Sequence, residues 1–279
     1  MTLKQALDEG VLLLESAKIS DAKIDAWYLL SFITGISRAD YFLRQNDAMD
    51  EESYAKYQEA LRRRASHIPL QHITGEQDFM GLTFRVNEHV LIPRQDTETL
   101  VEQTLKEIPE GSRILDLCTG SGCVIISLVV LGKELTGVGV DISDEALAVA
   151  RDNGARLAGD RVDFIHSDLF DSVTGKFDCI VSNPPYIPSK DIEELEPEVK
   201  DHEPRLALDG TEDGLLFYRN ITKEAHDYLN QGGWLLVEIG YDQGESVSQL
   251  FIDNGFKEVE VIRDLAGNNR VVKGHLWLF

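Results

Sequence analysis

Residues 177–188 read Phe-Asp-Cys-Ile-Val-Ser-Asn-Pro-Pro-Tyr-Ile-Pro, and this stretch is the most informative one in the chain. Its first six residues form a compact run with aromatic and β-branched side chains that prolines stop, which predicts a short buried strand over 177–182. Asn183 follows at the carboxyl end of this strand, where open α/β sheets bind their ligands. Two prolines then restrict the loop to few backbone conformations. The stretch therefore predicts a buried strand that ends in a rigid polar loop.

This loop presents hydrogen-bond acceptors. The side-chain carbonyl of Asn183, the main-chain carbonyl of Pro184 and the aromatic face of Tyr186 suit a planar group that carries an NH2. Such a group can donate two hydrogen bonds and be stacked at the same time. The simpler interpretation, a proline-rich turn that only closes a strand, stays open on these residues alone.

A second loop, Cys118-Thr-Gly-Ser-Gly122, lies between a predicted strand and a predicted apolar helix. Its glycines let the backbone approach a ligand, and the amino end of the helix favours an anion. The third glycine of the dinucleotide fingerprint would fall at Ile125, and no Gly-x-x-x-x-Gly-Lys-Ser sequence is present. A loop without either phosphate-binding device suits a nucleoside whose only anion is a carboxylate. S-adenosylmethionine is such a ligand.

Two aspartates follow the next predicted strands and complete the predicted cofactor site. Asp141 is placed to accept both ribose hydroxyls, and Asp168 to bind the adenine amino group, with Leu169 or Phe170 against the ring. Singly, each aspartate is more often a helix cap or turn residue. Together, at the ends of successive strands, they favour a ligand. The predicted cofactor-binding residues are Cys118, Thr119, Gly120, Ser121, Gly122, Asp141, Ile142, Asp168, Leu169 and Asn183.

Strand and helix patterns alternate from residue 113 onward. Strands are predicted over 114–117, 135–140, 162–165, 177–182, 232–239, 256–261 and 271–279. Helices are predicted over 123–131, 143–157, 214–229 and 242–254. Alternation at this spacing predicts an α/β fold with a doubly wound, mostly parallel, seven-stranded sheet.

The first 78 residues show helical periodicity only, over 3–14, 26–33 and 53–66. We predict a helical bundle over 1–78, a β-hairpin linker over 79–95 and an α/β domain over 96–279. The hairpin turn is predicted at Asn87-Glu88, and Asp96 is predicted to cap a helix that runs to Ile108. The Arg62-Arg63-Arg64 run is interpreted as a solvated face.

Composition narrows the possible partners. The 279 residues are 43% hydrophobic and 27% charged, as in globular proteins. The net charge of −22 disfavours a broad nucleic-acid interface and is compatible with a cationic ligand or a basic protein. Three cysteines without metal-type spacing favour a reducing, cytoplasmic location, and the histidines show no metal-binding motif. The longest apolar run, 123–131, is too short to span a bilayer and no signal peptide is visible, so no membrane partner is expected.

Taken together, the chain resembles the class I S-adenosylmethionine-dependent methyltransferases and, more narrowly, the release factor glutamine methyltransferases (the PrmC/HemK family). The resemblance runs nearly end to end. Besides the helical amino-terminal region, it rests on Pro93-Arg-Gln-Asp-Thr-Glu98, Leu115-Asp-Leu-Cys-Thr-Gly-Ser-Gly122, Ser167-Asp-Leu-Phe170, Val181-Ser-Asn-Pro-Pro-Tyr-Ile187, Glu203-Pro-Arg-Leu-Ala-Leu208, Asp213-Gly-Leu215, Glu238-Ile-Gly240 and Asp264-Leu-Ala-Gly267. Asn-Pro-Pro-Tyr is shared with other amino methyltransferases, so it indicates the chemistry and not the substrate. Gln95 and Cys118 depart from the family pattern, in which proline and glycine are usual.

The resemblance implies a substrate, the glutamine of the Gly-Gly-Gln loop in bacterial peptide chain release factors, methylated on its side-chain amide nitrogen. It implies S-adenosylmethionine as cofactor, a release factor as protein partner and a methyltransferase domain over 96–279. The helical bundle over 1–78 is then expected to be the substrate-recognition domain. Asn183, Pro184 and Tyr186 are the expected catalytic residues, and together with Pro185 they are the expected substrate contacts. No general base and no metal ion are expected.

Four alternatives stay open. The same chemistry would serve a ribosomal-protein glutamine or an exocyclic amine of DNA or RNA, although the net charge argues against a nucleic acid. A nucleotide-dependent dehydrogenase is disfavoured by Ile125. A non-catalytic adenosine-binding module would not need Asn183 and Tyr186.

Overall fold

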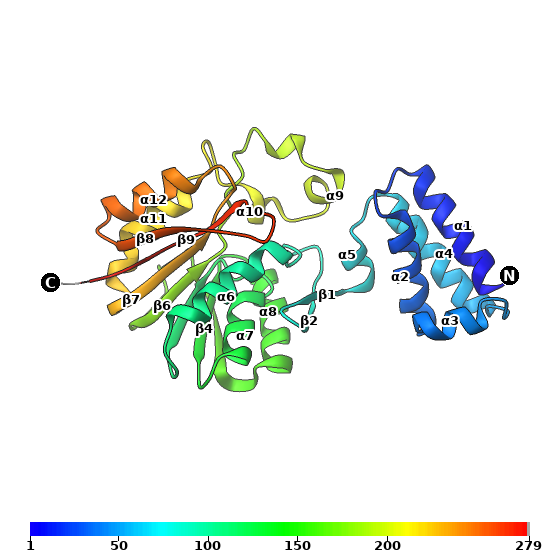
Figure 1. Ribbon diagram of the computed structural model, residues 1–279, viewed down its shortest axis with the longest axis horizontal. Helices are drawn as coiled ribbons and strands as arrows, with labels where there is room; N and C mark the ends of the chain where they lie inside the picture. The colour runs from blue at the N-terminus through cyan, green and yellow to red at the C-terminus, as the bar shows by residue number, and fades with distance from the viewer. Residues whose placement is uncertain (278–279) are drawn as a thin grey trace. The chain divides into compact units, whose positions relative to one another are not determined.

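The computed structural model describes residues 1–277 and divides into two compact units. The first comprises Met1–Gly75 together with Glu196–His202. The second comprises Glu76–Leu195 and Glu203–Phe279. In Figure 1 the helices of Met1–Gly75 run from blue to cyan, and the main sheet of the second unit runs from green to red.

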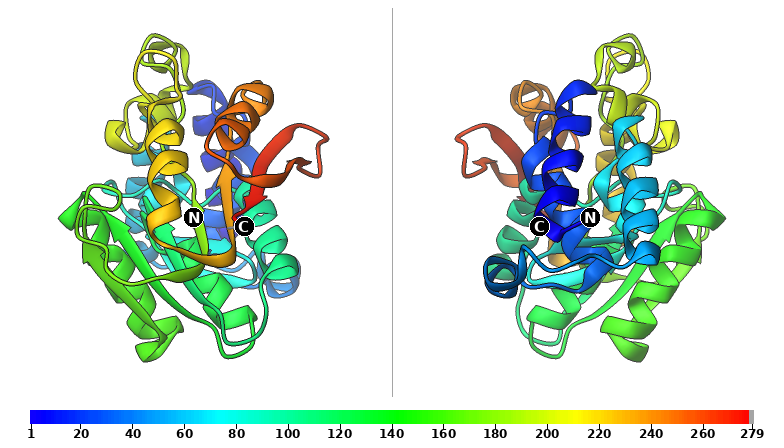
Figure 2. Two further views of the ribbon diagram at one scale, coloured as in Figure 1. Left: turned by 90° about the vertical axis from the view of Figure 1, so that its left-hand side faces the viewer. Right: turned by 90° about the vertical axis from the view of Figure 1, so that its right-hand side faces the viewer.

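The first unit is a bundle of short helices that lie side by side (Figure 2). Its helices are α1 (Leu3–Ser16), α2 (Ala22–Thr34), α3 (Arg38–Arg44), α4 (Glu51–Ala65) and α5 (Leu70–Thr74). The three predicted helices correspond to α1, α2 and α4, whereas α3 and α5 were missed because so few residues show little periodicity. The buried Tyr57 donates a hydrogen bond to the Ala26 carbonyl at 2.9 Å. A Cβ on Gly10 would lie 2.4 Å from the Tyr57 hydroxyl oxygen, so glycine permits this packing.

A buried ion cluster lies inside this unit and corrects the interpretation of the arginine run. Arg64 in α4 is buried, with its Nε 2.7 Å from an Asp25 carboxylate oxygen and its Nη2 2.5 Å from Glu198. Burial raises the pKa of Asp25, and the Arg64 partner opposes that rise. Glu198 belongs to the short helix α9 (Pro197–Lys200). Because an unpaired buried charge is strongly destabilising, the cluster fixes the Glu196–His202 segment to the bundle.

The second unit opens with a hairpin, whose turn was predicted in the wrong place. Strands β1 (Glu76–Phe79) and β2 (Leu82–Arg85) pair through the two-residue turn Met80-Gly81. Both turn residues have positive φ, 51° and 74°, as two-residue turns of type I′ require. The prediction of a turn at Asn87-Glu88 is therefore wrong, since Met80-Gly81 was interpreted as part of a strand.

The main sheet confirms the doubly wound α/β prediction. Its strands are β3 (Arg113–Leu117), β4 (Thr136–Asp141), β5 (Val162–His166), β6 (Phe177–Ser182), β7 (Leu229–Glu238), β8 (Lys257–Arg263) and β9 (Asn269–His275). Their spatial order is β5-β4-β3-β6-β7-β9-β8. Strands β3 to β7 pair in parallel, and β9 runs antiparallel to both of its neighbours. The predicted strand over 271–279 corresponds to β9, but its last two residues lie outside the described chain.

Helices cover both faces of this sheet (Figure 1, Figure 2). On one face lie α6 (Glu98–Glu107), α7 (Cys123–Leu131) and α8 (Asp144–Leu157), and on the other α11 (Leu216–Glu224) and α12 (Gly244–Asp253). Helix α7 is apolar along almost its whole length, because both the sheet and its neighbouring helices bury it. Within residues 1–277, no helix combines the length and the apolar character needed to cross a membrane.

The strand order reverses beside β3, and this reversal determines where a ligand can bind. The chain passes from β3 outward through β4 to β5, and then returns to the other side of β3 with β6. In parallel sheets the loops on either side of such a switch point diverge and leave a crevice at the carboxyl edge. The loops after β3, β4, β5 and β6 meet at this edge, and they carry the predicted site residues.

Candidate active site

The glycine loop after β3 is held by hydrogen bonds to the strands beside it. The main-chain N–H of Thr119 donates to the Val140 carbonyl at 2.9 Å, and its hydroxyl donates to Asp116 at 2.6 Å. Asp116 is buried, and burial raises its pKa to about 7. Cys118 and Gly120 adopt positive φ, 58° and 55°. The left-handed backbone at Cys118 explains why glycine is usual there in the resembled family.

Asp141 shapes this loop and also lines the cavity beneath it. One carboxylate oxygen accepts from the Gly120 N–H at 2.9 Å, and the other accepts from the Ser143 N–H at 3.0 Å. Burial raises the pKa of Asp141, and these N–H donors oppose the rise. Ser143 in turn caps α8 by accepting from the Ala146 N–H. Each Asp141 oxygen keeps a second lone pair for a ligand hydroxyl.

In the loop after β5, the two candidates for an adenine contact, Leu169 and Phe170, lie in different surroundings. Phe170 is buried in the core, where its ring stacks on Tyr228 with 4.6 Å between centroids. Leu169 instead lines the cavity, and its backbone has positive φ of 45°. Asp168 lies exposed beside it on the cavity wall. The loop thus offers a carboxylate and an apolar side chain to the same ligand.

One cavity brings most of the predicted residues together. Those that line it are Cys118, Thr119, Gly120, Ser121, Asp141, Ile142, Asp168, Leu169, Asn183 and Pro185. Among the described residues, the lining does not include three others of the predicted set, Gly122, Pro184 and Tyr186. The loops after four parallel strands thus form one wall of a single site.

Long-range contacts hold the loop that carries Asn183. The Ser182 hydroxyl donates to the Leu117 carbonyl at 2.8 Å, and the Gln243 amide donates to the Tyr186 carbonyl at 3.0 Å. A Cβ on Gly214 would lie 2.3 Å from the Tyr186 carbonyl oxygen, so only glycine allows this approach. The Asn183 side-chain NH2 donates to the Thr97 hydroxyl oxygen at 3.4 Å. This contact leaves the Asn183 carbonyl oxygen available to a substrate.

A second wall of the cavity was not predicted from the sequence. It consists of His89, Val90, Leu91, Pro93, Arg94, Thr97, Pro204, Leu206, Ala207 and Phe217. The buried Glu203 joins its two segments by accepting from the Ile92 N–H at 3.0 Å and from Arg94 at 2.5 Å. The motifs at 93–98 and 203–208 were noted as points of resemblance, without a role in the site. Asp96, predicted to cap α6, lies in a 3₁₀ turn and pairs with Arg270 at 3.0 Å, so that prediction is wrong.

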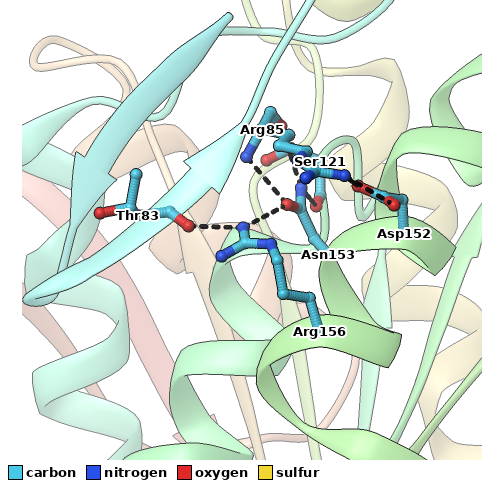
Figure 3. Close-up of polar contacts among 6 residues, drawn as sticks. All are labelled: Thr83, Arg85, Ser121, Asp152, Asn153 and Arg156. Atoms are coloured by element: carbon cyan, nitrogen blue, oxygen red, sulfur yellow. Dashed lines mark hydrogen bonds and ion pairs between the residues drawn. The ribbon is translucent and has the colours of Figure 1, made fainter.

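A buried amide connects the hairpin to the glycine loop (Figure 3). The Asn153 side-chain carbonyl accepts from the Arg85 N–H at 2.8 Å, and its NH2 donates to the Arg85 and Ser121 carbonyls, both at 3.0 Å. Arg156 adds a further bond to the same Asn153 oxygen at 3.1 Å. Asn153 is fully buried, so each of these bonds is costly to lose. Asn153 therefore fixes the carbonyl of Ser121 at the edge of the cavity.

Asn153→Asp is expected to weaken S-adenosylmethionine binding about tenfold, because a carboxylate has no N–H to donate to the Ser121 and Arg85 carbonyls. Isothermal calorimetry on the full chain would measure this. The matched control is Arg156→Ala, which removes only bonds at the periphery, to the Asn153 side-chain oxygen and to the Thr83 carbonyl, and should change affinity less than threefold. Equal affinity of the Asn153→Asp protein and the unmodified chain would contradict the role.

The chemistry of the lining fits S-adenosylmethionine. Three carboxylates (Asp116, Asp141 and Asp168) line the cavity against one arginine, Arg94. This excess of acid suits a ligand that carries a sulfonium and an ammonium group. A Cβ added at Gly120 would have no atom of residues 1–277 within 4 Å, other than those of its chain neighbours. The space beside this glycine is therefore open to a ligand.

Comparison with known proteins supports the same assignment. Residues 5–75 match the sequence profile of the PrmC N-terminal domain, and residues 95–197 match that of the methyltransferase small domain. Two proteins named release factor glutamine methyltransferase are similar almost end to end. The protein from Geobacter sulfurreducens is 41% identical over 99% of this chain and 97% of its own, and that from Caulobacter vibrioides is 40% identical over 98% and 96%.

The chain belongs to the release factor glutamine methyltransferase family. A solved methyltransferase structure from Pyrococcus furiosus has the same fold, with a TM-score of 0.55 over 71% of this chain and 90% of that chain, at 19% identity. Membership of the family makes the chain a methyltransferase.

Proposed function

We propose that this chain transfers a methyl group from S-adenosylmethionine to the side-chain amide nitrogen of the glutamine in the Gly-Gly-Gln motif of bacterial peptide chain release factors. One observation carries the proposal: Asn183, in its rigid proline loop, lines the same cavity as Asp141 and the glycine loop. The relatives' names supply the substrate class. A ribosomal-protein glutamine and a nucleic-acid amine are retained only as outcomes of the test.

The cofactor would be held by residues 118–122, Asp141, Ile142, Asp168 and Leu169. Asp141 would accept the ribose hydroxyls, and Asp168 with Leu169 would contact the adenine. When bound, S-adenosylmethionine supplies an electrophilic methyl group. The protein's task is to bring an amide nitrogen to that group in the correct orientation.

The substrate nitrogen needs help because its lone pair is delocalised into the amide carbonyl. The Asn183 side-chain oxygen and the Pro184 carbonyl would accept its two hydrogens. These bonds strengthen as positive charge develops on nitrogen, so they stabilise the transition state more than the bound substrate. Pro185 would form part of the rim, and Tyr186 would hold the amide plane by stacking. The Tyr186 phenol stays neutral, because burial raises its pKa.

Radiolabelled methyl transfer tests the function. The full chain is incubated with tritiated S-adenosylmethionine and either purified release factor or a release factor whose motif glutamine is replaced by alanine. We expect label on the first protein and none on the second. Label on a ribosomal protein or on nucleic acid, with none on release factor, would support a rival substrate and contradict the proposal.

The helical unit is proposed to recognise the folded release factor. A three-residue loop offers little contact area, and specific recognition of a folded partner normally buries about 1,200 Å² or more in total. Helix α2 carries a stripe of exposed apolar side chains one turn apart, Ile24, Tyr28 and Phe32, with exposures of 58%, 53% and 53%. Exposed apolar residues in such an arrangement are typical of protein-binding surfaces.

Replacing Ile24, Tyr28 and Phe32 together with serine is expected to lower kcat/KM for intact release factor about tenfold or more, because an apolar contact is lost. S-adenosylmethionine affinity and turnover of a short Gly-Gly-Gln peptide should stay within twofold. Ile252→Ser, at an exposed residue of α12, is the control. Surface changes are preferable to removal of residues 1–75, which would also leave the Glu196–His202 segment without its bundle. Unchanged kcat/KM for release factor would contradict the role of the stripe.

The same proposal implies a cytoplasmic location, where release factors take part in translation. The substrate would be a protein, and the chain would not bind nucleic acid directly, in keeping with its net charge of −22.

A further inference from the structure

The loop at residues 93–98 is fixed through nearly every polar side chain that it carries. Arg94 pairs with Glu203, Asp96 pairs with Arg270, and a Glu98 carboxylate oxygen accepts from the Met80 N–H at 2.7 Å. Arg270 is itself held by Asp264 at 3.1 Å. These partners come from three separate parts of the chain, around residues 80, 203 and 264–270. A loop fixed in this way holds its one buried polar residue, Thr97, at a defined position.

Thr97 lies on the cavity wall beside Asn183. Its side chain is almost completely buried, with 2% of the residue exposed, and its hydroxyl oxygen accepts from the Asn183 NH2 at 3.4 Å. A threonine hydroxyl can accept and donate at the same time. Thr97 therefore still has a proton to donate, and its acceptor must lie on the side away from Asn183.

Glu238 is a buried carboxylate close enough to Thr97 for the two side chains to interact. It is the last residue of β7, the strand that pairs with β6, and only 2% of it is exposed. Among the described residues, its Oε2 is buried without a hydrogen-bond partner. Burial raises the pKa of Glu238 to about 7, and the Thr97 hydroxyl is the foremost group that opposes the rise, ahead of Arg270 and Tyr186. The negative charge of Asp96, like burial, raises the pKa of Glu238.

We propose that Thr97 and Glu238 are positioning residues of the transfer reaction: the Thr97 hydroxyl accepts from the Asn183 NH2 and donates to the Glu238 carboxylate, so that the Asn183 carbonyl oxygen faces the substrate. Because a carboxylate can only accept, Glu238 determines the direction of both hydrogen bonds: Thr97 donates to Glu238, and Asn183 donates to Thr97. The proposal deepens the proposed function and rests on it for the identity of the substrate.

The physical need for such a chain follows from the shape of an asparagine side chain. Its oxygen and its NH2 are nearly the same size, so packing alone does not distinguish the two orientations. The wrong orientation would place the Asn183 NH2 against the substrate NH2, where neither can accept. A hydrogen-bond chain that ends on a buried carboxylate selects the productive orientation before the substrate arrives, as positioning groups do at other sites.

The test compares Thr97→Val, which keeps the shape without the hydroxyl, with Thr97→Ser, which restores the hydroxyl. For Thr97→Val we expect kcat on release factor to fall about tenfold or more, with S-adenosylmethionine affinity within threefold of the unmodified chain. Thr97→Ser should recover kcat to within threefold. Equal losses in both variants, or a parallel loss of cofactor affinity, would indicate packing alone and overturn the proposal. So would a Thr97→Val protein with unchanged kcat.

A second measurement does not depend on the substrate. In ¹⁵N-labelled protein, the side-chain NH2 of Asn183 is identified by its disappearance in Asn183→Ala, and its hydrogen exchange is then recorded. Protection should be present in the unmodified chain and in Thr97→Ser, and should be lost in Thr97→Val. Protection that is the same in all three would overturn the proposal. If the three proteins show this pattern but the unmodified chain does not label release factor, the proposed substrate is wrong and the positioning role stands.

Glu238→Gln tests the acceptor end of the chain. In the unmodified protein, kcat should rise as the pH increases through about 7, because ionisation makes Glu238 a pure acceptor. The glutamine variant does not ionise, so its kcat should lack this step and stay below the kcat of the unmodified chain at pH 8. The same pH profile in both proteins would contradict a role for the carboxylate.

Discussion

Asn183→Ala is expected to lower methyl transfer to release factor by about 10²-fold or more, while S-adenosylmethionine still binds with similar affinity. The side-chain oxygen of Asn183 would accept a hydrogen from the attacking nitrogen, and this bond is strongest in the transition state. Its loss should therefore appear in kcat and not in cofactor binding. Single-turnover transfer of labelled methyl, together with calorimetry, separates these two quantities.

The control for this variant is Asn230→Ala. Asn230 is an exposed asparagine of β7 that donates to Asp178 at 2.7 Å, away from the cavity lining. Its replacement should leave both turnover and affinity within twofold. If Asn183→Ala retains turnover to within a few-fold, Asn183 only closes β6 as a turn residue. The mechanism proposed for the Asn-Pro-Pro-Tyr loop would then be wrong.

Asp141→Ala is expected to weaken S-adenosylmethionine binding by an order of magnitude or more. The ribose hydroxyls lose a charged acceptor, and the N–H groups of Gly120 and Ser143 lose the carboxylate that holds them. The second effect loosens the glycine loop itself, so the loss should exceed that of one exposed hydrogen bond. Calorimetry on the folded variant measures the change.

The neighbouring Asp144→Ala provides the control, because Asp144 is an exposed carboxylate in the first turn of α8. The affinity of this variant for S-adenosylmethionine should be unchanged.

Acidification should have the same effect as the Asp141→Ala substitution. Because burial raises the pKa of Asp141 above the ordinary 3.8, the carboxylate is protonated and affinity falls at a higher pH than for an exposed aspartate. Unchanged affinity in Asp141→Ala would refute the ribose assignment.

The sequence by itself determined the sheet and the loops at its carboxyl edge. Strand β6 was predicted over its full length, because a buried strand in a doubly wound sheet is a short apolar run with sharp ends. The glycine loop, Asp141 and Asn183 were found for the same local reason. Each directly follows such a run, and strands that run in parallel bring their carboxyl ends to one edge. The fold and one wall of the site were therefore contained in short stretches of sequence.

Only the tertiary structure decided what surrounds these loops. Glu203 joins Ile92 and Arg94 across more than a hundred residues, and Thr97 meets Asn183 across 86. Such pairs leave no periodic pattern, because a single polar side chain that finds its partner by folding resembles any exposed charge in the sequence. Arg64 shows this directly: it follows two exposed arginines but is buried against Asp25 and Glu198. Apolar spacing encodes which residues are buried together, whereas the pairing of buried polar groups depends on the packing that folding produces.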